Sequence, residues 1–320
     1  MKNIFYTAVF IFTLFACHAI FAQSNYTQEM HSYGSSGRDA YNKGDLKAAR
    51  NSYESALNIA QLHYLIKDEV LYLYNLAKID ISAGFADRAQ ARLSEIQKKI
   101  DKGVKAEDIV PASKLLSGEI MLATRDFKKA SVIFKGMIDD KNIKDESLKN
   151  SVYLNYARAL LEDGDMAGAK KIIEDLKKKN IGSPSMKGTI FYVDGLYFEK
   201  LGDRDNALAA FDKALDFDRM SGNSLKTAKS LVKLGEIKAA SGEKDPAIEY
   251  FTRTLEILRY MREDRLQLKP LLALANISDS KSLKMKYLKE GRALAKKGNF
   301  ADYLPAFEAE ISKLESDSSK

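Results

Sequence analysis

The sequence predicts an all-α protein built from stacked helical hairpins, and two observations support this fold class. The 320-residue chain has only five prolines and 18 glycines and is rich in Lys, Glu, Ala and Leu, a composition typical of helical proteins. A small residue also recurs about every forty positions, at Ala49, Ala89, Ala130, Ala169, Ala207 and Ala247. A fixed period of this size indicates a repeat solenoid, in which each unit packs only on its neighbours.

The first 22 residues have the pattern of a secretory signal. Lys2 precedes an apolar stretch (4–22), and a polar leader (23–30) follows it. We expect cleavage after Ala22. Two alternatives stay open: the four residues ending at Cys17 resemble a bacterial lipobox, which would make Cys17 a lipidated first residue, and the stretch is long enough to remain as an uncleaved anchor. Because Cys17 is the single cysteine, either cleavage leaves no thiol for a disulfide, a metal site or redox chemistry.

Each repeat unit within 31–299 has the features of a helical hairpin. A second small residue lies twelve positions before each marker, at Gly37, Ala77, Gly118, Ala157, Gly195 and Gly235. A turn glycine separates the two small residues in most units, at Gly44, Gly84, Gly164, Gly202 and Gly242. Four positions after the marker comes a bulky residue: Tyr53, Leu93, Phe134, Ile173, Phe211 and Phe251. Small residues on both helices allow close approach of the backbones, and the bulky side chain fills the space beside them.

The two ends of the array are less regular. Leu283 and Tyr287 mark a degenerate seventh unit, and residues 300–320 are expected to form a capping helix and a polar tail. We expect Pro111, Pro184 and Pro270 to fall between units, at the beginning of first helices, where a missing backbone donor costs nothing.

This pattern of small residue, glycine turn, small residue, bulky residue and closing Ala-Leu resembles the tetratricopeptide repeat family. The resemblance covers roughly Tyr33 to Leu294 and is most complete over Gly195 to Leu215 and Gly235 to Leu255. It implies a right-handed alpha-alpha superhelix, a tetratricopeptide-like solenoid of about six to seven helical hairpins with a C-terminal capping helix. The commonest repeat of the family has about 34 residues, so the units here resemble an extended variety of about 40.

A search for catalytic and metal-binding patterns favours a protein without chemistry of its own. The sequence has no HExxH, CxxC pair, phosphate loop or dinucleotide fingerprint. Only His31 and His63 remain after signal removal, and neighbouring carboxylates such as Asp203 and Asp205 fall in turns, where Asp caps the next helix. The net charge of +7 comes from interleaved signs and not from a basic face. We therefore expect no metal, no cofactor, no catalytic residue and no nucleic-acid partner.

The resemblance also implies where a partner binds, because the first helix of each hairpin lines the concave face in this family. Projecting that frame onto the chain gives a set of candidate binding residues of mixed character: Arg38, Tyr41, Asn42, Tyr74, Lys78, Glu119, Leu122, Leu154, Arg158, Leu161, Tyr192, Glu199, Lys200 and Glu236. Tyrosines, aliphatic residues and both charges suit an extended peptide or a helix of another protein. Arg38 and Lys78 make the N-terminal part the more basic, so an acidic segment or a C-terminal carboxylate is a candidate ligand there.

These features predict a protein-interaction scaffold in a bacterial cell envelope, most simply in the periplasm, that contacts a membrane only through an N-terminal lipid or anchor. Two alternatives remain at this point. One is the recognition subunit of an envelope enzyme complex that acts on the cell wall, and the other is an enzyme with a site scattered across the groove, which would require a deep pocket with converging buried polar groups.

Overall fold

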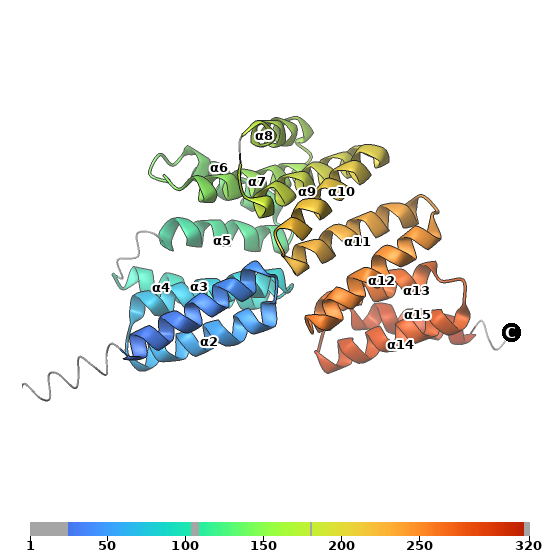
Figure 1. Ribbon diagram of the computed structural model, residues 1–320, viewed down its shortest axis with the longest axis horizontal. Helices are drawn as coiled ribbons and strands as arrows, with labels where there is room; N and C mark the ends of the chain where they lie inside the picture. The colour runs from blue at the N-terminus through green and yellow to red at the C-terminus, as the bar shows by residue number, and fades with distance from the viewer. Residues whose placement is uncertain (1–24, 104–108, 180, 317–320) are drawn as a thin grey trace, which may run out of the picture.

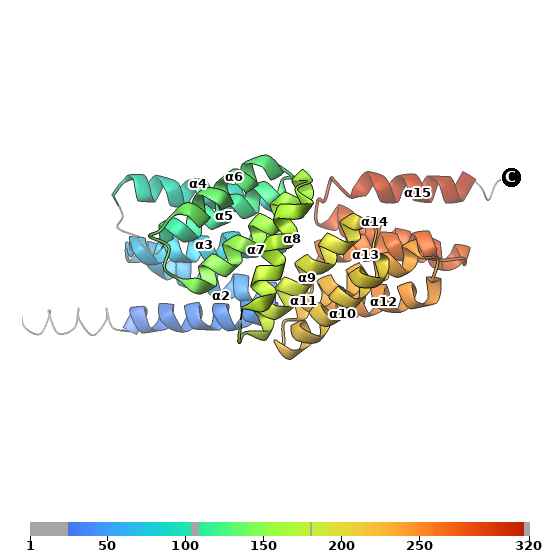
Figure 2. The same cartoon turned by 90° about the horizontal axis from the view of Figure 1, so that it is seen from above.

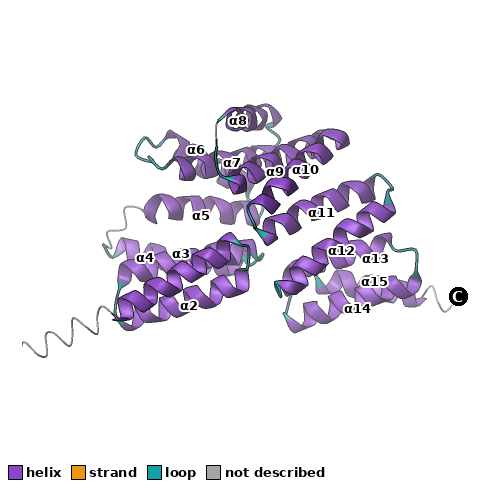
Figure 3. Ribbon diagram, viewed as in Figure 1, coloured by secondary structure: helices purple, strands orange, loops and turns teal. Residues whose placement is uncertain are grey.

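The computed structural model describes residues 25–103, 109–179 and 181–316, and these residues form helices and turns without a strand (Figure 3). The all-α prediction is therefore confirmed for this part of the chain. The expected signal (1–22) and Cys17 lie outside the described residues. The expected polar leader differs from the structure, because residues 25–42 form one helix in which Met30 is fully buried.

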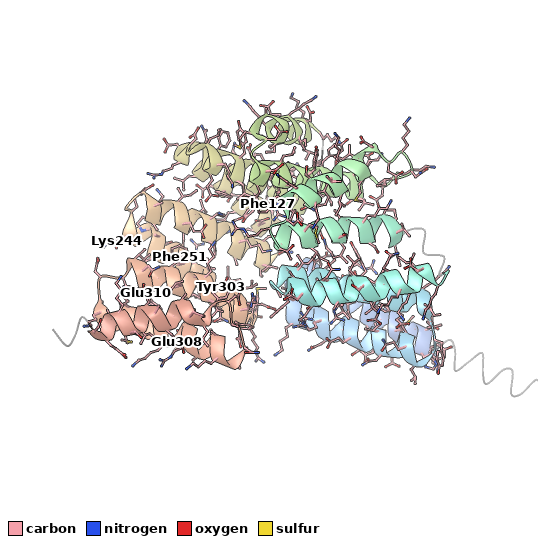
Figure 4. All side chains as sticks on the ribbon, turned by 180° about the vertical axis from the view of Figure 1, so that it is seen from behind. Phe127, Lys244, Phe251, Tyr303, Glu308 and Glu310 are labelled. Carbon is pink, nitrogen blue, oxygen red and sulfur yellow. The ribbon has the colours of Figure 1, made fainter. Side chains whose placement is uncertain are left out.

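The helices follow one another as antiparallel hairpins along a curved path (Figure 1). Each helix packs on the next, and the first helices of neighbouring hairpins also touch. The first six hairpins are residues 25–42 with α2 (Leu46–Leu62), α3 (Ile66–Ser82) with α4 (Ala86–Asp101), α5 (Ile109–Ala123) with α6 (Phe127–Asp139), α7 (Glu146–Asp163) with α8 (Met166–Lys178), α9 (Pro184–Leu201) with α10 (Arg204–Met220), and α11 (Ser224–Ala240) with α12 (Lys244–Tyr260). The chain continues through α13 (Asp264–Ile277), α14 (Lys281–Lys297) and α15 (Leu304–Ser316), the helix that carries the labelled Glu308 and Glu310 in Figure 4.

The contacts inside the hairpins are those that the repeat pattern predicts. The glycine of a first helix faces the aromatic ring of the second helix so closely that a Cβ on Gly195 would lie 2.7 Å from Phe211 Cε1, and a Cβ on Gly37 would lie 2.8 Å from Tyr53. Phe211 is fully buried. Glycine is thus required at these positions by packing, because any side chain would occupy the space of the ring.

The second helices begin with a repeated cap. The side chains of Asp45, Asp126, Asp165 and Asp203 each accept a hydrogen bond from the backbone N–H three residues on, at the starts of α2, α6, α8 and α10. This satisfies one of the backbone donors that a helix start leaves free. The recurrent turn aspartates therefore have the structural role that their spacing predicts.

The C-terminal end departs from the predicted frame in two ways. Gly291 of α14 faces Phe307 of α15 as the earlier glycines face their rings, so α14 packs with α15 as well as with α13. The prediction for Pro270 was wrong, since α13 begins at Asp264 and Pro270 lies inside it. The neighbouring Leu268 and Leu271 are fully buried, and we attribute the tolerance of the proline to the packing of this apolar face.

The path curves so far that the N-terminal hairpins contact the C-terminal half (Figure 2). Ser224 N–H donates to the Lys43 carbonyl at 2.9 Å, and Asn223 Nδ2 donates to the Asn42 carbonyl at 2.8 Å. Leu225 belongs to the same hydrophobic cluster as the N-terminal hairpins. We call this contact between the turn at 42–44 and the start of α11 the closure contact. It brings together residues about 180 positions apart at one end of the inner face.

Candidate functional site

Two connected cavities occupy the inner face, and we call them together the hollow. The wide cavity, of about 950 Å³, is lined mainly by α3, α5, α7, α9 and the start of α11. The narrow cavity, of about 490 Å³, is lined mainly by α9, α11 and α13. Arg158, Thr189, Lys226 and Lys229 line both cavities and thus mark where they meet. The hollow is therefore built mostly from the first helices of the hairpins.

Some predicted binding residues do line the hollow. Lys78, Glu119, Leu122, Leu154 and Arg158 line the wide cavity, and Tyr192 and Arg158 line the narrow one. Tyr192 also packs edge-on against Phe211, with 5.3 Å between the ring centroids, and burial raises the pKa of its hydroxyl. The Phe211 ring, which packs in the notch that the missing side chain of Gly195 leaves, thus also supports Tyr192 in the wall of the hollow.

Most predicted charged residues are engaged in ion pairs between neighbouring first helices. Lys78 Nζ lies 2.5 Å from Glu119, Lys200 lies 2.7 Å from Glu162, Lys233 lies 2.9 Å from Glu199, and Glu236 pairs with both Lys233 and Lys269. Burial alone would lower the pKa of Lys78, but the Glu119 carboxylate beside it raises that pKa overall. Stacked helices bring equivalent positions side by side, so opposite charges there neutralise each other and leave little free charge for a ligand.

The other predicted residues do not line the two cavities. Tyr41 forms a hydrogen bond with Ser82 Oγ at 3.3 Å, and Asn42 contributes its carbonyl to the closure contact. Tyr74 is half-buried, with a pKa raised by burial. Leu161 is in the core between α7 and α8, and Arg38 is exposed on the first helix. Of the two residues from which a basic N-terminal end was predicted, Lys78 is neutralised by Glu119 and Arg38 lies outside the two cavities.

Three cations that have no ion-pair partner among the described residues lie where the two cavities meet. A fourth, Lys179, lines the wide cavity and donates to Asn150 Oδ1 at 3.2 Å. Lys226 donates only to neutral oxygens, the Ser185 carbonyl and Oγ at 2.8 Å and Thr189 Oγ1 at 2.7 Å. Arg158 donates to Asn155 Oδ1 at 3.1 Å. Burial, and then the charges of Arg158, Lys226 and Lys78, lower the pKa of Lys229 to about 8. The sequence projection missed Lys226 and Lys229, although they continue the inner face of α11 toward its N-terminus.

A buried carboxyl group stands behind these lysines. Asp218 of α10 is 2% exposed, its Oδ2 accepts from Ser230 Oγ at 2.8 Å, and its Oδ1 has no hydrogen-bond donor. Oδ1 lies against Gly188 of α9, where a Cβ would collide with it. Burial raises the pKa of Asp218 to about 6, and the Ser230 hydrogen bond and the charges of Lys226 and Lys229 only partly oppose this. The ionised form is thus disfavoured in the folded chain.

We expect Asp218→Asn to stabilise the protein at neutral and higher pH. The pKa of Asp218 is higher in the folded chain than in the unfolded chain. Its contribution to the free energy of unfolding is therefore fully present below about pH 4 and is lost as the pH rises through 6. From a pKa shift of this size we expect the variant to gain about 2 to 3 kcal/mol in free energy of unfolding at pH 8, and less at pH 5. Urea unfolding of both proteins at the two pH values measures the difference. Asp216→Asn, an exposed change on the same helix, is the control; equal gains for both variants would contradict the assignment.

The part of the chain that the structure describes shows two further absences. Within it, no three His, Cys, Asp or Glu side chains lie close enough to hold a metal ion. None of the helices traced there combines the length and the apolar character that a membrane span needs.

Comparison with known proteins gives the family that the repeats resemble. A tetratricopeptide repeat family model matches residues 195–259, from Gly195 of α9 to Arg259 in the last turn of α12. These are the two units in which the sequence pattern is most complete. No curated protein sequence matches the chain.

Solved structures share the fold over most of the chain. A Rap protein in complex with competence and sporulation factor has a TM-score of 0.63 at 14% identity, with 89% of this chain and 80% of that chain covered. A signal transduction ATPase with a tetratricopeptide repeat sensor from Pyrococcus horikoshii has a TM-score of 0.60 at 15% identity, and the match covers 81% of this chain but only 42% of that longer protein. The apo form of RapI has a TM-score of 0.52 at 13% identity, covering 92% and 83%. The described part of the chain is thus an all-helical, tetratricopeptide-like solenoid, with a recognisable tetratricopeptide repeat segment at residues 195–259.

Proposed function

We propose that this chain is a non-catalytic protein-interaction scaffold that holds a peptide or an extended protein segment in its hollow. The observation that carries the proposal is the hollow itself. Pockets for small molecules measure about 300 to 1,000 Å³, and the wide cavity of about 950 Å³ continues into the narrow one through shared walls. An elongated occupant fills such a space better than a compact small molecule.

The lining is of the kind that recognises polypeptide. Tyr192, Leu122 and Met186 offer apolar surface, and the polar side chains of Asn150, Ser151 and Thr189 offer hydrogen bonds along the walls. A mixture of aromatic, aliphatic and polar groups is typical of peptide grooves. The Rap structure, whose fold this chain shares, is a complex with competence and sporulation factor, which supports binding by a solenoid of this kind.

The absence of enzyme chemistry is part of the proposal. Asp218 and Lys229 have shifted pKa values and line a cavity, as catalytic groups often do. However, the Asp218 carboxyl faces Gly188 and Ser230 behind the wall, and no described Ser, Cys or Thr is paired with a His there. Binding accounts for the lining without a catalytic group.

We also propose that the protein is exported to a bacterial cell envelope and acts there. The apolar stretch at 4–22 after Lys2, followed by polar residues, supports this setting.

A photo-crosslinking amino acid at Ser151 tests the proposed function. Ser151 lines the wide cavity, whereas Val132 on α6 is 73% exposed and serves as the matched outer position. Random twelve-residue peptides are displayed and selected on the purified chain, and the binders are then irradiated with each variant. We expect cross-links at Ser151 and none at Val132. Failure to select any peptide, or cross-links at Val132 alone, would overturn the proposal.

A further inference from the structure

We propose that the occupant of the hollow is acidic, and that a carboxylate side chain of the bound segment pairs with Lys229 and Arg158 beside Lys226. This inference rests on the proposed function and names the chemistry of its ligand. It differs from the expectation drawn from Arg38 and Lys78, because the cations concerned lie on α7 and α11, where the two cavities meet.

The first reason is that these cations lack the ion-pair partners that most charged residues of the inner face have. Lys78, Lys200 and Lys233 all pair with glutamates of neighbouring helices at 2.9 Å or less. Lys229 forms no hydrogen bond or ion pair with any residue that the structure describes, and Arg158 contacts only a neutral amide. Both side chains are exposed in the hollow, so a bound carboxylate can reach them without displacing a protein partner.

The second reason is that the cations disfavour one another. Lys229 lies within electrostatic reach of Arg158, Lys226 and Lys78, and their charges add to burial in lowering its pKa to about 8. Burial also lowers the pKa of Lys226. Like charges gathered around a cavity are a strained arrangement that an opposite charge in the cavity relieves.

The third reason concerns the size of the complementary charge. Arg158, Lys226 and Lys229 supply three positive charges, and Asp218 behind them supplies one negative charge when ionised, so the local excess is two. Glu119 also lines the wide cavity. This excess matches one or two carboxylates, whereas a polyanion such as a nucleic acid would meet the glutamate and the aspartate of the same walls. An acidic polypeptide segment is therefore the occupant that the charges fit.

The test uses the peptides selected on the whole chain, synthesised with acetylated and amidated ends so that only side chains carry carboxylates. Each peptide is also made with its Asp and Glu replaced by Asn and Gln. Affinities are measured by fluorescence anisotropy for the wild type, Lys229→Met, Arg158→Met and Lys229→Arg. Lys238→Met is the matched control, because Lys238 lies on the same helix, pairs with Glu243 and does not line the hollow.

We expect acidic residues to be enriched in the selected peptides, and the neutralised versions to bind at least about tenfold more weakly, the loss that about 1.4 kcal/mol produces. Lys229→Met and Arg158→Met lose affinity for the acidic peptides by a similar factor but bind the neutralised peptides as the wild type does. Lys229→Arg retains the acidic preference, and Lys238→Met leaves it unchanged. Affinity for the acidic peptides also falls between pH 7 and 9 as Lys229 loses its proton.

Three outcomes overturn the inference. Peptides that cross-link at Ser151 but show no acidic preference would refute it while the proposed function stands. Equal losses for Lys229→Met and Lys238→Met would mean that general charge and not this site attracts the peptide. Inorganic phosphate that binds the wild type but not Lys229→Met, with no acidic peptide binding at all, would assign the site to a small anion and refute the proposed function as well.

Discussion

Gly195→Ala should destabilise the protein by about 1 to 3 kcal/mol, although alanine is the better helix former. The added Cβ would lie 2.7 Å from Phe211 Cε1, and Phe211 is fully buried, so the ring or the helix has to move. Overpacking of a close-packed core costs about this much. The same displacement reaches Tyr192, whose ring touches Phe211 and lines the narrow cavity, so peptide affinity should fall together with stability.

Gly136→Ala is the matched control for this experiment. Gly136 also lies inside a helix, α6, but it is exposed and a Cβ there would meet no atom within 4 Å. The change should therefore stabilise the chain by about 0.5 to 1 kcal/mol, the ordinary gain of alanine over glycine in a helix. Chemical unfolding of both variants measures the contrast. A gain in stability for Gly195→Ala would contradict the notch-and-ring packing on which the repeat frame depends.

The hairpin frame could be predicted from the sequence because its determinants are local. A glycine and an aromatic ring 16 positions apart lie across a single turn, and this spacing is independent of the rest of the fold, as Gly195 and Phe211 show. The final pair, Gly291 and Phe307, has the same spacing but was missed. It falls out of the forty-residue period, since Gly291 follows the preceding notch glycine, Gly235, by 291 − 235 = 56 positions and its ring is on α15.

The site could be predicted only in part, because its charges depend on contacts between hairpins. Of the charged residues that the sequence placed on one face, Lys78 and Glu119 line the wide cavity, whereas Glu199 and Glu236 line neither cavity. The sequence did not show that charges of neighbouring helices would neutralise them. The closure contact decides which cations have no anionic partner. Lys229 lines the hollow and forms no ion pair with any described residue, and the pattern of its own repeat unit does not predict this.

Gly44→Ala should open the closure contact, whereas Gly202→Ala should not. Both glycines occupy the same place in their hairpins, have left-handed backbone (φ +80° and +76°) and precede a capping aspartate. Alanine therefore costs about 1 to 2 kcal/mol of backbone strain at either position. At Gly202 no steric clash adds to this strain, because a Cβ there meets no atom within 4 Å. The pair thus separates the strain of the turn from the contact between the two halves.

At Gly44 the added Cβ would lie 2.6 Å from the backbone nitrogen of Leu225 and 2.9 Å from its Cβ. Relief requires the start of α11 to move away from the turn at 42–44, which withdraws Leu225 from the N-terminal hydrophobic cluster. We expect an additional cost of about 1 to 3 kcal/mol beyond that of Gly202→Ala. Unfolding free energies of the two variants, compared with the wild type, give this difference directly.

The most direct readout is the amide hydrogen of Ser224. This residue begins α11, so its N–H has no partner within the helix and owes its protection to the Lys43 carbonyl at 2.9 Å. Exchange at Ser224 should be slow in the wild type and in Gly202→Ala and fast in Gly44→Ala. Because α11 carries Lys226 and Lys229, loss of this protection should coincide with loss of peptide binding. Slow exchange at Ser224 in Gly44→Ala would mean that the chain absorbs the clash locally, and closure would then not be what holds the cations of α11 at the meeting of the two cavities.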